Sequence, residues 1–600
     1  MEPQKFYQDR ITIENLALQD LIKKIDRISW IRLLCVLGSV PVLYYFFYHN
    51  ITTGVTALLG TVGLFAFLVS KHQKFQQQKK HLELSLFLWQ NEENNIKSYS
   101  NVYYNGYEFV EHKHPYSQDL DLFGDNSVFS WISRARTYHG IHRLTDWFTK
   151  PRNIQEILNT QTMVKELSHL MQWRHDFALS LWPLEQDQER KNFHRIINLT
   201  ETPVTFGTSW NWIFSYSRWA IWWILLAGLF ALIIPVLMKL WTLILIIHAL
   251  LNLYFARKVN VYHHSLTKLN AELLAYSTAL ELIEQMPWTS IPLNKMVAEL
   301  KNKSGRSAVS QLRQLARIGR QLDLRLNMLG GLLFNVLALW DFRQLAALKL
   351  WQQDTDQSIK NYFLVLGELE AISSLATLQF NQPGWIMPEF VTDYFTLSFK
   401  SCGHPLIPLS ERINNDYSLV GHAKIDVITG SNMAGKSTFL RTLGVNFILA
   451  HLGGPVCASE ARLSTARMYT SMRIADNVNE HTSTFKAELN RLRLMLDALK
   501  RGEQVFVLID EMLRGTNSQD KYLGSRAMIL KLLAHGAVGL VATHDLQLAA
   551  IEDDHPGQIR NFYFDITVAG GEYHFDYKLK SGRCTTFNAS SLLRDLGLDV

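Results

Sequence analysis

A glycine-rich segment carries the residues whose types and spacing most clearly indicate chemistry. It follows a strand-like run at 423–429, precedes a helical pattern at 439–450, and fits the pattern G-x-x-x-x-G-K-[ST]. In such a segment backbone N–H groups surround phosphate oxygens, Lys436 reaches the β and γ phosphates, and Ser437 ligates Mg²⁺. The sequence therefore predicts a site for ATP and Mg²⁺, with nucleotide contacts from Gly430, Ser431, Asn432, Met433, Ala434, Gly435, Lys436, Ser437 and Thr438.

Two further strand candidates end in residues that could complete this site. The apolar run at 504–509 is typical of a buried parallel strand and ends in Asp510 and Glu511. We expect Asp510 to hold Mg²⁺ through water and Glu511 to orient or deprotonate the attacking water in phosphoryl transfer. The run at 538–543 delivers His544 to the same edge, where its imidazole could sense the γ-phosphate. The predicted catalytic residues are Lys436, Glu511 and His544, and the predicted metal ligands are Ser437 and Asp510.

The position of His544 decides between two interpretations of this histidine. A lone histidine in a folded chain is more often a structural side chain than a catalytic one. Because it follows a third strand of parallel type, whose carboxyl end meets those of the other two, the catalytic interpretation is favoured here.

Composition limits the architecture that can carry this site. The chain has 600 residues, whereas a single core stops growing near ~250–300, so three or four structural units are expected. Its charged fraction of 19% lies below the ~25% of ordinary soluble domains, which indicates apolar segments beyond normal cores. A net charge of +6 over this length does not by itself indicate nucleic acid. The four cysteines have no C-x-x-C spacing, so neither a disulfide framework nor a zinc site is predicted.

Two strongly apolar regions predict transmembrane helical hairpins, at 29–72 and 210–257. Between Arg32 and Lys71 there is no charged residue, and His49 with Asn50 divides the run into two stretches that each approach the ~20 residues needed to cross a bilayer. Between Arg218 and Arg257 the only charged residue is Lys239, which again separates two such stretches. The alternative is a pair of buried core helices, but these normally keep a polar stripe, and neither region has one.

The flanking charges predict the orientation of both hairpins. Lysines and arginines precede and follow the first hairpin, and Arg257 and Lys258 follow the second. Because cytoplasmic flanks carry an excess of Lys and Arg, both termini should face the cytoplasm in a multi-pass protein of the cytoplasmic (inner) membrane. The polar start of the chain at 1–26 differs from a cleaved signal peptide, so the first hairpin is expected to be a permanent anchor.

Helical periodicity outside the hairpins predicts an all-α region before the strand-rich part. The uncharged stretch 326–340 is interpreted as a buried helix, because about fifteen residues fall short of the ~20 that a span requires. The predicted units are a cytoplasmic segment 1–28, hairpin 29–72, helical core 73–209, hairpin 210–257, helical lever and core 258–398, and a domain at 399–600.

Four motifs of the last domain resemble, in the right order, the ATPase domain of the MutS family of DNA mismatch-repair proteins. They are 429–438, 483–488, 510–518 and 542–544, and the entry at 403–407 with 415–416 is similar to the family's adenine-binding loop. The resemblance implies an α/β P-loop ATPase domain of the ABC type, preceded by an all-α core and lever region that here includes the two transmembrane hairpins.

The same resemblance implies a homodimer through the ATPase domains, with a composite site. Ser483 of one chain would contact the γ-phosphate held by the other, and 514–518 would lie along the dimer interface. This sequence departs from the family pattern at Ala434, His481 and Leu513, where the family usually has glycine. Residues 1–110 show no mismatch-reading domain, and the second hairpin falls where the family inserts its DNA clamp, so direct mismatch recognition is not expected.

The leading functional hypothesis is a membrane-anchored, homodimeric MutS-like ATPase whose ATP binding and hydrolysis are coupled to DNA binding or a repair-related activity. The alternative is an ATP-driven machine of the membrane that does not bind DNA directly. An inactive scaffold is disfavoured, because Lys436, Ser437, Asp510 and Glu511 are all present.

Overall fold

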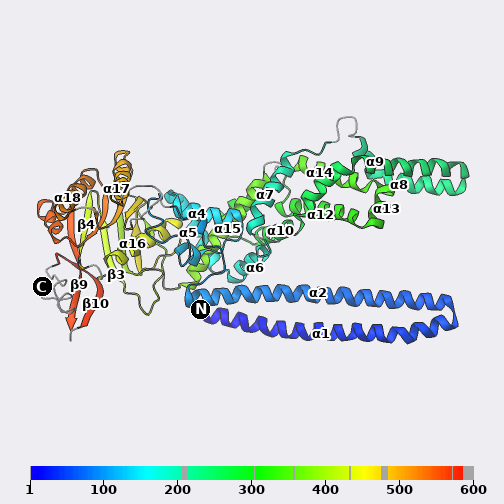
Figure 1. Ribbon diagram of the computed structural model, residues 1–600, viewed down its shortest axis with the longest axis horizontal. Coiled ribbons are helices and arrows are strands. Elements are labelled where there is room, and N and C mark those ends of the chain that lie inside the picture. Colours follow the sequence, from blue (N-terminus) through cyan, green and yellow to red (C-terminus); the bar gives the residue numbers. More distant parts are fainter. Residues whose placement is uncertain are drawn as a thin grey trace. The chain divides into compact units, whose positions relative to one another are not determined.

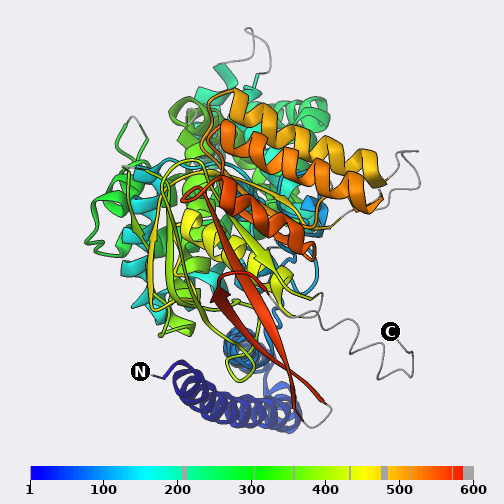
Figure 2. The ribbon, with the colours of Figure 1, turned by 90° about the vertical axis from the view of Figure 1, so that its left-hand side faces the viewer.

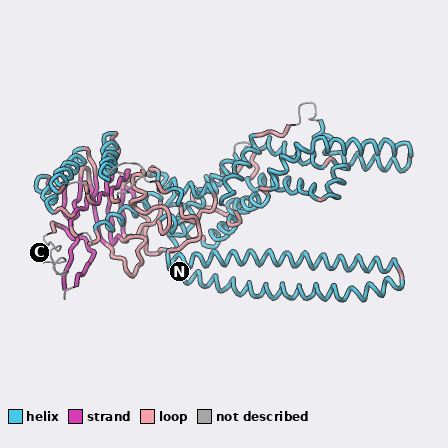
Figure 3. The backbone as a smooth tube through the Cα atoms, in the orientation of Figure 1, coloured by secondary structure: helices cyan, strands magenta, loops and turns pink. Residues whose placement is uncertain are grey.

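The computed structural model describes residues 2–111, 113–184, 186–205, 212–302, 304–355, 358–392, 394–431, 434–473, 484–514, 517–569 and 572–584. Its internal contacts divide the chain into two units, Met1–Val102 and Tyr103–Val600. The first unit is helical. In the second unit, the described strands all lie beyond residue 388, where Figure 3 draws them in magenta.

The first unit is a pair of long antiparallel helices, α1 (Pro3–His49) and α2 (Ile51–Ser98) (Figure 1). The chain reverses at Asn50, whose side chain accepts a hydrogen bond from the Thr52 amide at 2.9 Å and caps α2. Away from the reversal, Glu14 accepts hydrogen bonds from Ser85 and Trp89 and links the two helices. By length and composition both helices could cross a membrane. The predicted hairpin 29–72 consists of the end of α1 and the start of α2, on either side of the reversal at Asn50.

A second helical pair, α8 (Trp212–Ile233) and α9 (Pro235–Thr267), belongs to the second unit. The two helices lie side by side, and both also meet the length and composition criteria for a membrane span (Figure 1). Large apolar side chains are exposed along both of them, among them Trp219, Trp222, Leu229, Leu232, Val236 and Leu253. The chain reverses at Ile234, and Lys239 follows one turn later.

The uncharged stretch 326–340 is not the single buried helix that its length suggests. It contains the end of η3 (Asp323–Leu326), the short helix α13 (Met328–Ala338), and the start of α14 (Trp340–Asp354). Leu332 and Leu333 on α13 are 66% and 57% exposed. The prediction of burial is wrong because α13 packs against α8 and α9 on one side only and leaves its other face uncovered.

The remaining helices form a body around α15 (Ser358–Asn381), which packs against α4 and α5. By length and composition α15 could also span a membrane, but most of its residues are buried among the other helices. The other helices of this body are η1 (Tyr107–Phe109), α3 (Val128–Ile132), α4 (Tyr138–Thr149), α5 (Ile154–Ser168), α6 (Met171–Leu181), α7 (Gln186–Glu201), α10 (Asn270–Gln285), α11 (Ile291–Ala298) and α12 (Ala308–Leu322).

Two sheets make up the strand-rich part. The larger has the order β10-β9-β4-β8-β7-β6, in which β6 to β9 and β4 run parallel and only β10 is antiparallel. Figure 2 shows the β9–β10 ribbon in red as it projects from the sheet. The smaller sheet has the order β1-β5-β2-β3. The bounds are β1 (Glu389–Phe390), β2 (Thr396–Cys402), β3 (Asn415–Val420), β4 (Lys424–Thr429), β5 (Glu460–Leu463), β6 (Arg467–Ser471), β7 (Val505–Asp510), β8 (Val538–Thr543), β9 (Ile559–Ala569) and β10 (Glu572–Ser581).

Helices cover both faces of the larger sheet, as a buried parallel sheet requires. The side chains of β7 alternate in direction: Phe506 packs on Phe447 of α16, whereas Val505, Val507 and Ile509 belong to a core shared with α17 and α18. The three predicted strands are present, and the predicted helix 439–450 lies within α16. The helices are α16 (Lys436–Leu452), α17 (Thr484–Lys500), α18 (Ser518–Ala534), η5 (Leu546–Ala550) and α19 (Ile551–Asp554).

Candidate nucleotide-binding site

The loop from β4 to α16 is shaped by two glycines with positive φ. Gly430 has φ +142°, and a Cβ atom there would lie 2.8 Å from the carbonyl oxygen of Phe564 on β9. Gly435 has φ +101° and immediately precedes the first turn of α16. Both positions therefore demand glycine. Ala434 is buried and needs no such freedom, so alanine is tolerated where the family pattern has glycine. Asn432 and Met433 lie outside the described residues.

Lys436 begins α16 and folds back over this loop. Its ammonium donates hydrogen bonds to the carbonyl oxygens of Gly430 and Ser431, at 2.6 and 2.7 Å. Burial lowers the pKa of this ammonium, and the charges of Asp510 and Glu511 act in the opposite direction. A partly desolvated cation at a helix N-terminus suits an anionic ligand, which could replace the two carbonyl partners.

The neighbouring Ser437 lies against the acidic end of β7. Its hydroxyl donates a hydrogen bond of 2.5 Å to Asp510, the last residue of that strand. The pairing follows from the sheet order, since β8 alone separates β4 from β7. Among the described residues no three His, Cys, Asp or Glu side chains gather as a metal site. One hydroxyl and one carboxylate nevertheless fit Mg²⁺, which takes few protein ligands when phosphate oxygens and water supply the rest.

Glu511 follows Asp510 in a left-handed backbone conformation, with φ +58°. Nδ1 of His544 contacts its carboxylate, and Nε of Arg514 lies 3.4 Å from it. Burial acts to raise the pKa of Glu511, but the hydrogen bond and charge of His544, with Lys521 and Arg514, lower it below the ordinary value. Glu511 is therefore an ionised carboxylate near neutral pH, held by groups that could orient it.

A cavity of about 460 Å³ adjoins the start of α16. Gly435, Lys436, Ser437 and Thr438 line it on one side, and the segment 402–415 and Tyr577 contribute to the rest. Burial lowers the pKa of His404 in this lining to about 4, so its imidazole is neutral at physiological pH. The segment that resembles the family's adenine-binding loop thus lies beside the residues predicted to contact phosphate.

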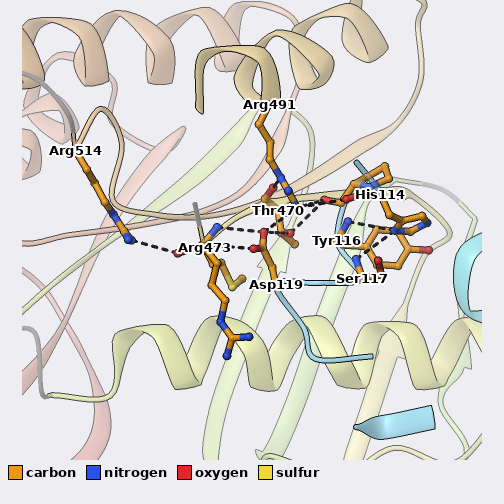
Figure 4. A network of polar contacts seen from close by, with 10 residues as sticks. His114, Tyr116, Ser117, Asp119, Thr470, Arg473, Arg491 and Arg514 are labelled. Atoms are coloured by element: carbon orange, nitrogen blue, oxygen red, sulfur yellow. Dashed lines mark hydrogen bonds and ion pairs between the residues drawn. The ribbon is translucent and has the colours of Figure 1, made fainter. Parts of the chain in front are cut away.

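Two aspartates that were not among the predicted site residues, Asp119 and Asp121, connect the helical body to this site, and Figure 4 shows the contacts of Asp119. The buried carboxylate of Asp119 accepts hydrogen bonds from the backbone amides of Met472 and Arg473 at 3.1 and 3.0 Å, and from Arg491 at 3.0 Å. Asp121 accepts hydrogen bonds from Nη1 and Nη2 of the Arg473 guanidinium and lies 3.3 Å from Arg441 on α16. These contacts fix the end of β6.

Arg514 extends this arrangement to the acidic pair. Its guanidinium donates to the backbone carbonyl oxygens of Met472, at 3.3 Å, and Asp510. The predicted residue Ser483 lies outside the described residues, as do 474–482 and 515–516.

Leu513 explains why the family pattern has glycine at its position. It has φ +58°, a conformation in which a leucine is strained, and its amide donates to Glu488 of α17 at 2.5 Å. Its side chain is buried against Gly524 of α18, where a Cβ atom would lie 2.3 Å from Leu513. The substitution is therefore accommodated by a neighbouring glycine.

The sheet order and the loop before α16 define an α/β domain with a largely parallel sheet and an anion-suited strand–loop–helix unit. Residues 426–590 match the protein family described as MutS domain V. The DNA mismatch repair protein MutS of Aquifex pyrophilus is 33% identical over 231 residues, which are 38% of this chain and 26% of that protein. The DNA mismatch repair protein MSH3 of Phaeosphaeria nodorum is 32% identical over 235 residues, which are 38% of this chain and 21% of that protein.

Residues 426–590 are therefore a divergent form of domain V of the MutS family. The DNA mismatch repair protein MutS of Thermotoga petrophila is 32% identical over 218 residues, which are 36% of this chain and 27% of that protein. The chain thus spans about a quarter of the length of the curated relatives that it matches.

Proposed function

We propose that this protein is a membrane-anchored ATPase of the MutS family that binds and hydrolyses ATP with Mg²⁺ as a homodimer. The observation that carries the proposal is the meeting of Lys436 and the Ser437–Asp510 hydrogen bond at one edge of a parallel sheet, beside the Glu511–His544 pair. These five side chains, which follow the ends of three strands, have the roles that phosphoryl transfer requires.

The roles follow from the environment of each side chain. Lys436 exchanges its two carbonyl partners for phosphate oxygens, and Ser437 with Asp510 holds Mg²⁺. When bound, Mg²⁺ neutralises charge that develops on the phosphates. Glu511, ionised because of its basic neighbours, orients or deprotonates the attacking water, and His544 holds the Glu511 carboxylate in place.

The dimer and its ligand are the next part of the proposal. Ser483 completes the site of the partner subunit, and the ATP state is transmitted through Arg473 and Asp121 to the helical body. The relatives are named as DNA mismatch repair proteins, so DNA or a DNA-bound partner at the cytoplasmic membrane face is the ligand that we favour.

A second candidate function, work on the membrane itself without DNA, rests on the path of the chain. Helix α9 ends at Thr267 and α10 begins at Asn270, so the body helices are joined almost directly to the apolar pair α8–α9. Because only two residues separate the helices, a movement of α10 would be transmitted directly to α9. In both candidates the protein is multi-pass in the cytoplasmic (inner) membrane, with both termini in the cytoplasm.

The ATPase proposal is tested with two substitutions in purified full-length protein. Lys436→Ala should abolish ATP binding or turnover, whereas Glu511→Gln should keep binding and trap a nucleotide-bound dimer, because only water activation is lost. Lys424→Ala, at the opposite end of β4, is the control and should leave turnover unchanged. Unchanged steady-state hydrolysis in either site variant would refute the assignment.

The two candidate functions are separated by binding to duplex, branched and single-stranded DNA across a salt series. Contacts to phosphates must weaken steeply as salt rises, because bound cations are released from DNA on binding. Salt-sensitive binding favours the first candidate. If the protein binds none of the three forms at low salt while its ATPase activity is intact, the second candidate, an ATP-driven membrane process without DNA, is favoured.

A further inference from the structure

The short helix α13 has an exposed apolar face that the proposed function does not use. No residue from 326 to 340 is charged, and Leu326, Leu332 and Leu333 are each more than half exposed. On its other side α13 packs against both α8 and α9. Helix α13 therefore adjoins the α8–α9 pair, along which large apolar side chains are also exposed.

Two side chains of α9, the buried His248 and the half-buried Asn252, bind carbonyl groups near the C-terminal end of α13. The amide nitrogen of Asn252 donates to the carbonyl oxygen of Asn335 at 3.0 Å, and Nδ1 of His248 lies 2.9 Å from that of Val336. The other ring nitrogen of His248 is 3.0 Å from the hydroxyl of Tyr216 on α8, and His248 is only 2% exposed. A consistent tautomer has Nδ1–H donate to Val336 while Nε2 accepts from Tyr216.

This arrangement suits a helix end surrounded by lipid. In water the last carbonyl groups of a helix can bind solvent, but in hydrocarbon each unsatisfied polar group costs several kcal/mol. Here His248 binds the carbonyl group of Val336, and the carbonyl group of Asn335 accepts from both the Leu339 amide and the Asn252 side chain. Polar residues in the middle of an apolar helix such as α9 normally face a partner inside the bundle, as His248 and Asn252 do.

The charged residues on either side of the segment pair with each other. Arg325 precedes it, Asp341 follows it, and Nη2 of the arginine lies 3.5 Å from Oδ2 of the aspartate. The indole of Trp340 donates to the carbonyl oxygen of Gln321 at 2.8 Å, and the axes of α13 and α14 differ by 72°. The two ends of the uncharged segment therefore lie close together. The segment is also shorter than the ~20 residues that a helix needs to cross a bilayer.

We propose that 326–340 is a re-entrant segment that enters the same bilayer as the α8–α9 pair and leaves on the same side, with Leu332, Leu333 and Phe334 in contact with lipid acyl chains. The inference rests on the proposed membrane anchoring of α8 and α9. It adds a third point at which the helical body, through α12 and α14, is attached to the membrane.

The test places an environment-sensitive fluorophore on single cysteines of the full-length protein in phospholipid vesicles. Cys35 and Cys584 are replaced by alanine, and the buried Cys402 and Cys457 remain. Leu333→Cys reports on α13. Leu229→Cys, exposed on α8, is the positive control, and Ser310→Cys, exposed on α12, is the control in water.

Lipids brominated in their acyl chains should quench the probe at 333 as they quench the one at 229, while iodide in the water should quench only the probe at 310. A probe at 333 that follows 310 overturns the inference and leaves the α8–α9 anchor standing. Protection from both quenchers also overturns it, since a protein surface, such as a second copy, then covers α13. If acyl-chain quenching is absent at 229 as well, membrane anchoring itself fails. Leu333 is exposed, and ATP turnover of each variant verifies its fold.

Discussion

Removal of the Asp119 carboxylate should destabilise the junction between the helical body and the nucleotide site. The side chain is 1% exposed and accepts four hydrogen bonds, from Thr470, Met472, Arg473 and Arg491. In Asp119→Ala the Thr470 hydroxyl keeps Pro115 as an acceptor, and Arg491 keeps the carbonyl oxygen of Thr470 at 2.8 Å. The amides of Met472 and Arg473 lose the partner shown here.

The expected magnitude follows from these losses. Each buried amide without a partner costs about 1–3 kcal/mol, and Arg491 loses its buried counter-charge. Removal of one partner of a buried ion pair typically costs about 3–5 kcal/mol, which we take as the expected destabilisation. A loss of about 3 kcal/mol corresponds to an opening of the end of β6 that is on the order of 100-fold more frequent.

Hydrogen exchange at the amides of Met472 and Arg473, measured by mass spectrometry on the detergent-solubilised full chain, tests this expectation. Exchange at these two amides should accelerate by up to about 100-fold. ATP turnover should fall, because Arg473 and Arg514 lose their fixed positions. Asp125→Ala is the matched control, since Asp125 is exposed in the same loop and should matter by less than about 0.5 kcal/mol. Equal exchange and equal turnover in Asp119→Ala and Asp125→Ala would refute the reasoning.

Three further predictions concern other parts of the chain. Burial raises the pKa of Glu370 to about 7, so the folded state binds this proton more tightly than the unfolded state. The stabilisation that this proton provides is complete below about pH 4.5 and is lost as the pH rises through about 7, so melting curves from pH 5 to 8 should show wild type losing up to about 3 kcal/mol relative to Glu370→Gln. A stability difference between wild type and Glu370→Gln that does not change with pH would contradict this prediction. Leu513→Gly should lower the melting temperature, by about 2 kcal/mol of stability, because loss of a buried leucine outweighs relief of its left-handed strain; a more stable variant would show that strain dominates. A cysteine at Lys239 should react with a membrane-impermeant thiol reagent from outside intact cells, whereas Cys402 and Cys584 should not, and labelling of position 239 only after lysis would place the α8 reversal in the cytoplasm.

Most of what the sequence predicted correctly about the fold is local in origin. The runs at 423–429, 504–509 and 538–543 are strands β4, β7 and β8, because β-branched and apolar residues in short runs form buried strands wherever they occur. The loop before α16 needs glycine at Gly430 and Gly435, which the spacing alone indicated. The order of these strands, in contrast, is not local information.

The burial of 326–340 was predicted wrongly for the same reason. Length and composition distinguish an apolar helix from a polar one, but they do not say what covers it. The core helix α15 and the exposed helix α13 both have apolar sequences, and only their neighbours differ.

The sequence by itself determined the chemistry that is available: a lysine and a serine after a glycine-rich turn, an acidic pair after a strand, and apolar helices long enough for a bilayer. These features depend on residues close together in the chain, where backbone preference and hydrophobic periodicity act directly. Only the tertiary structure decided that Ser437 meets Asp510, because the sheet places β8 between their strands. It also decided that Asp119 binds the end of β6 and that His248 and Asn252 bind the carbonyl groups of α13. Such contacts join segments tens to hundreds of residues apart, and the burial that favours them exists only once the chain has folded.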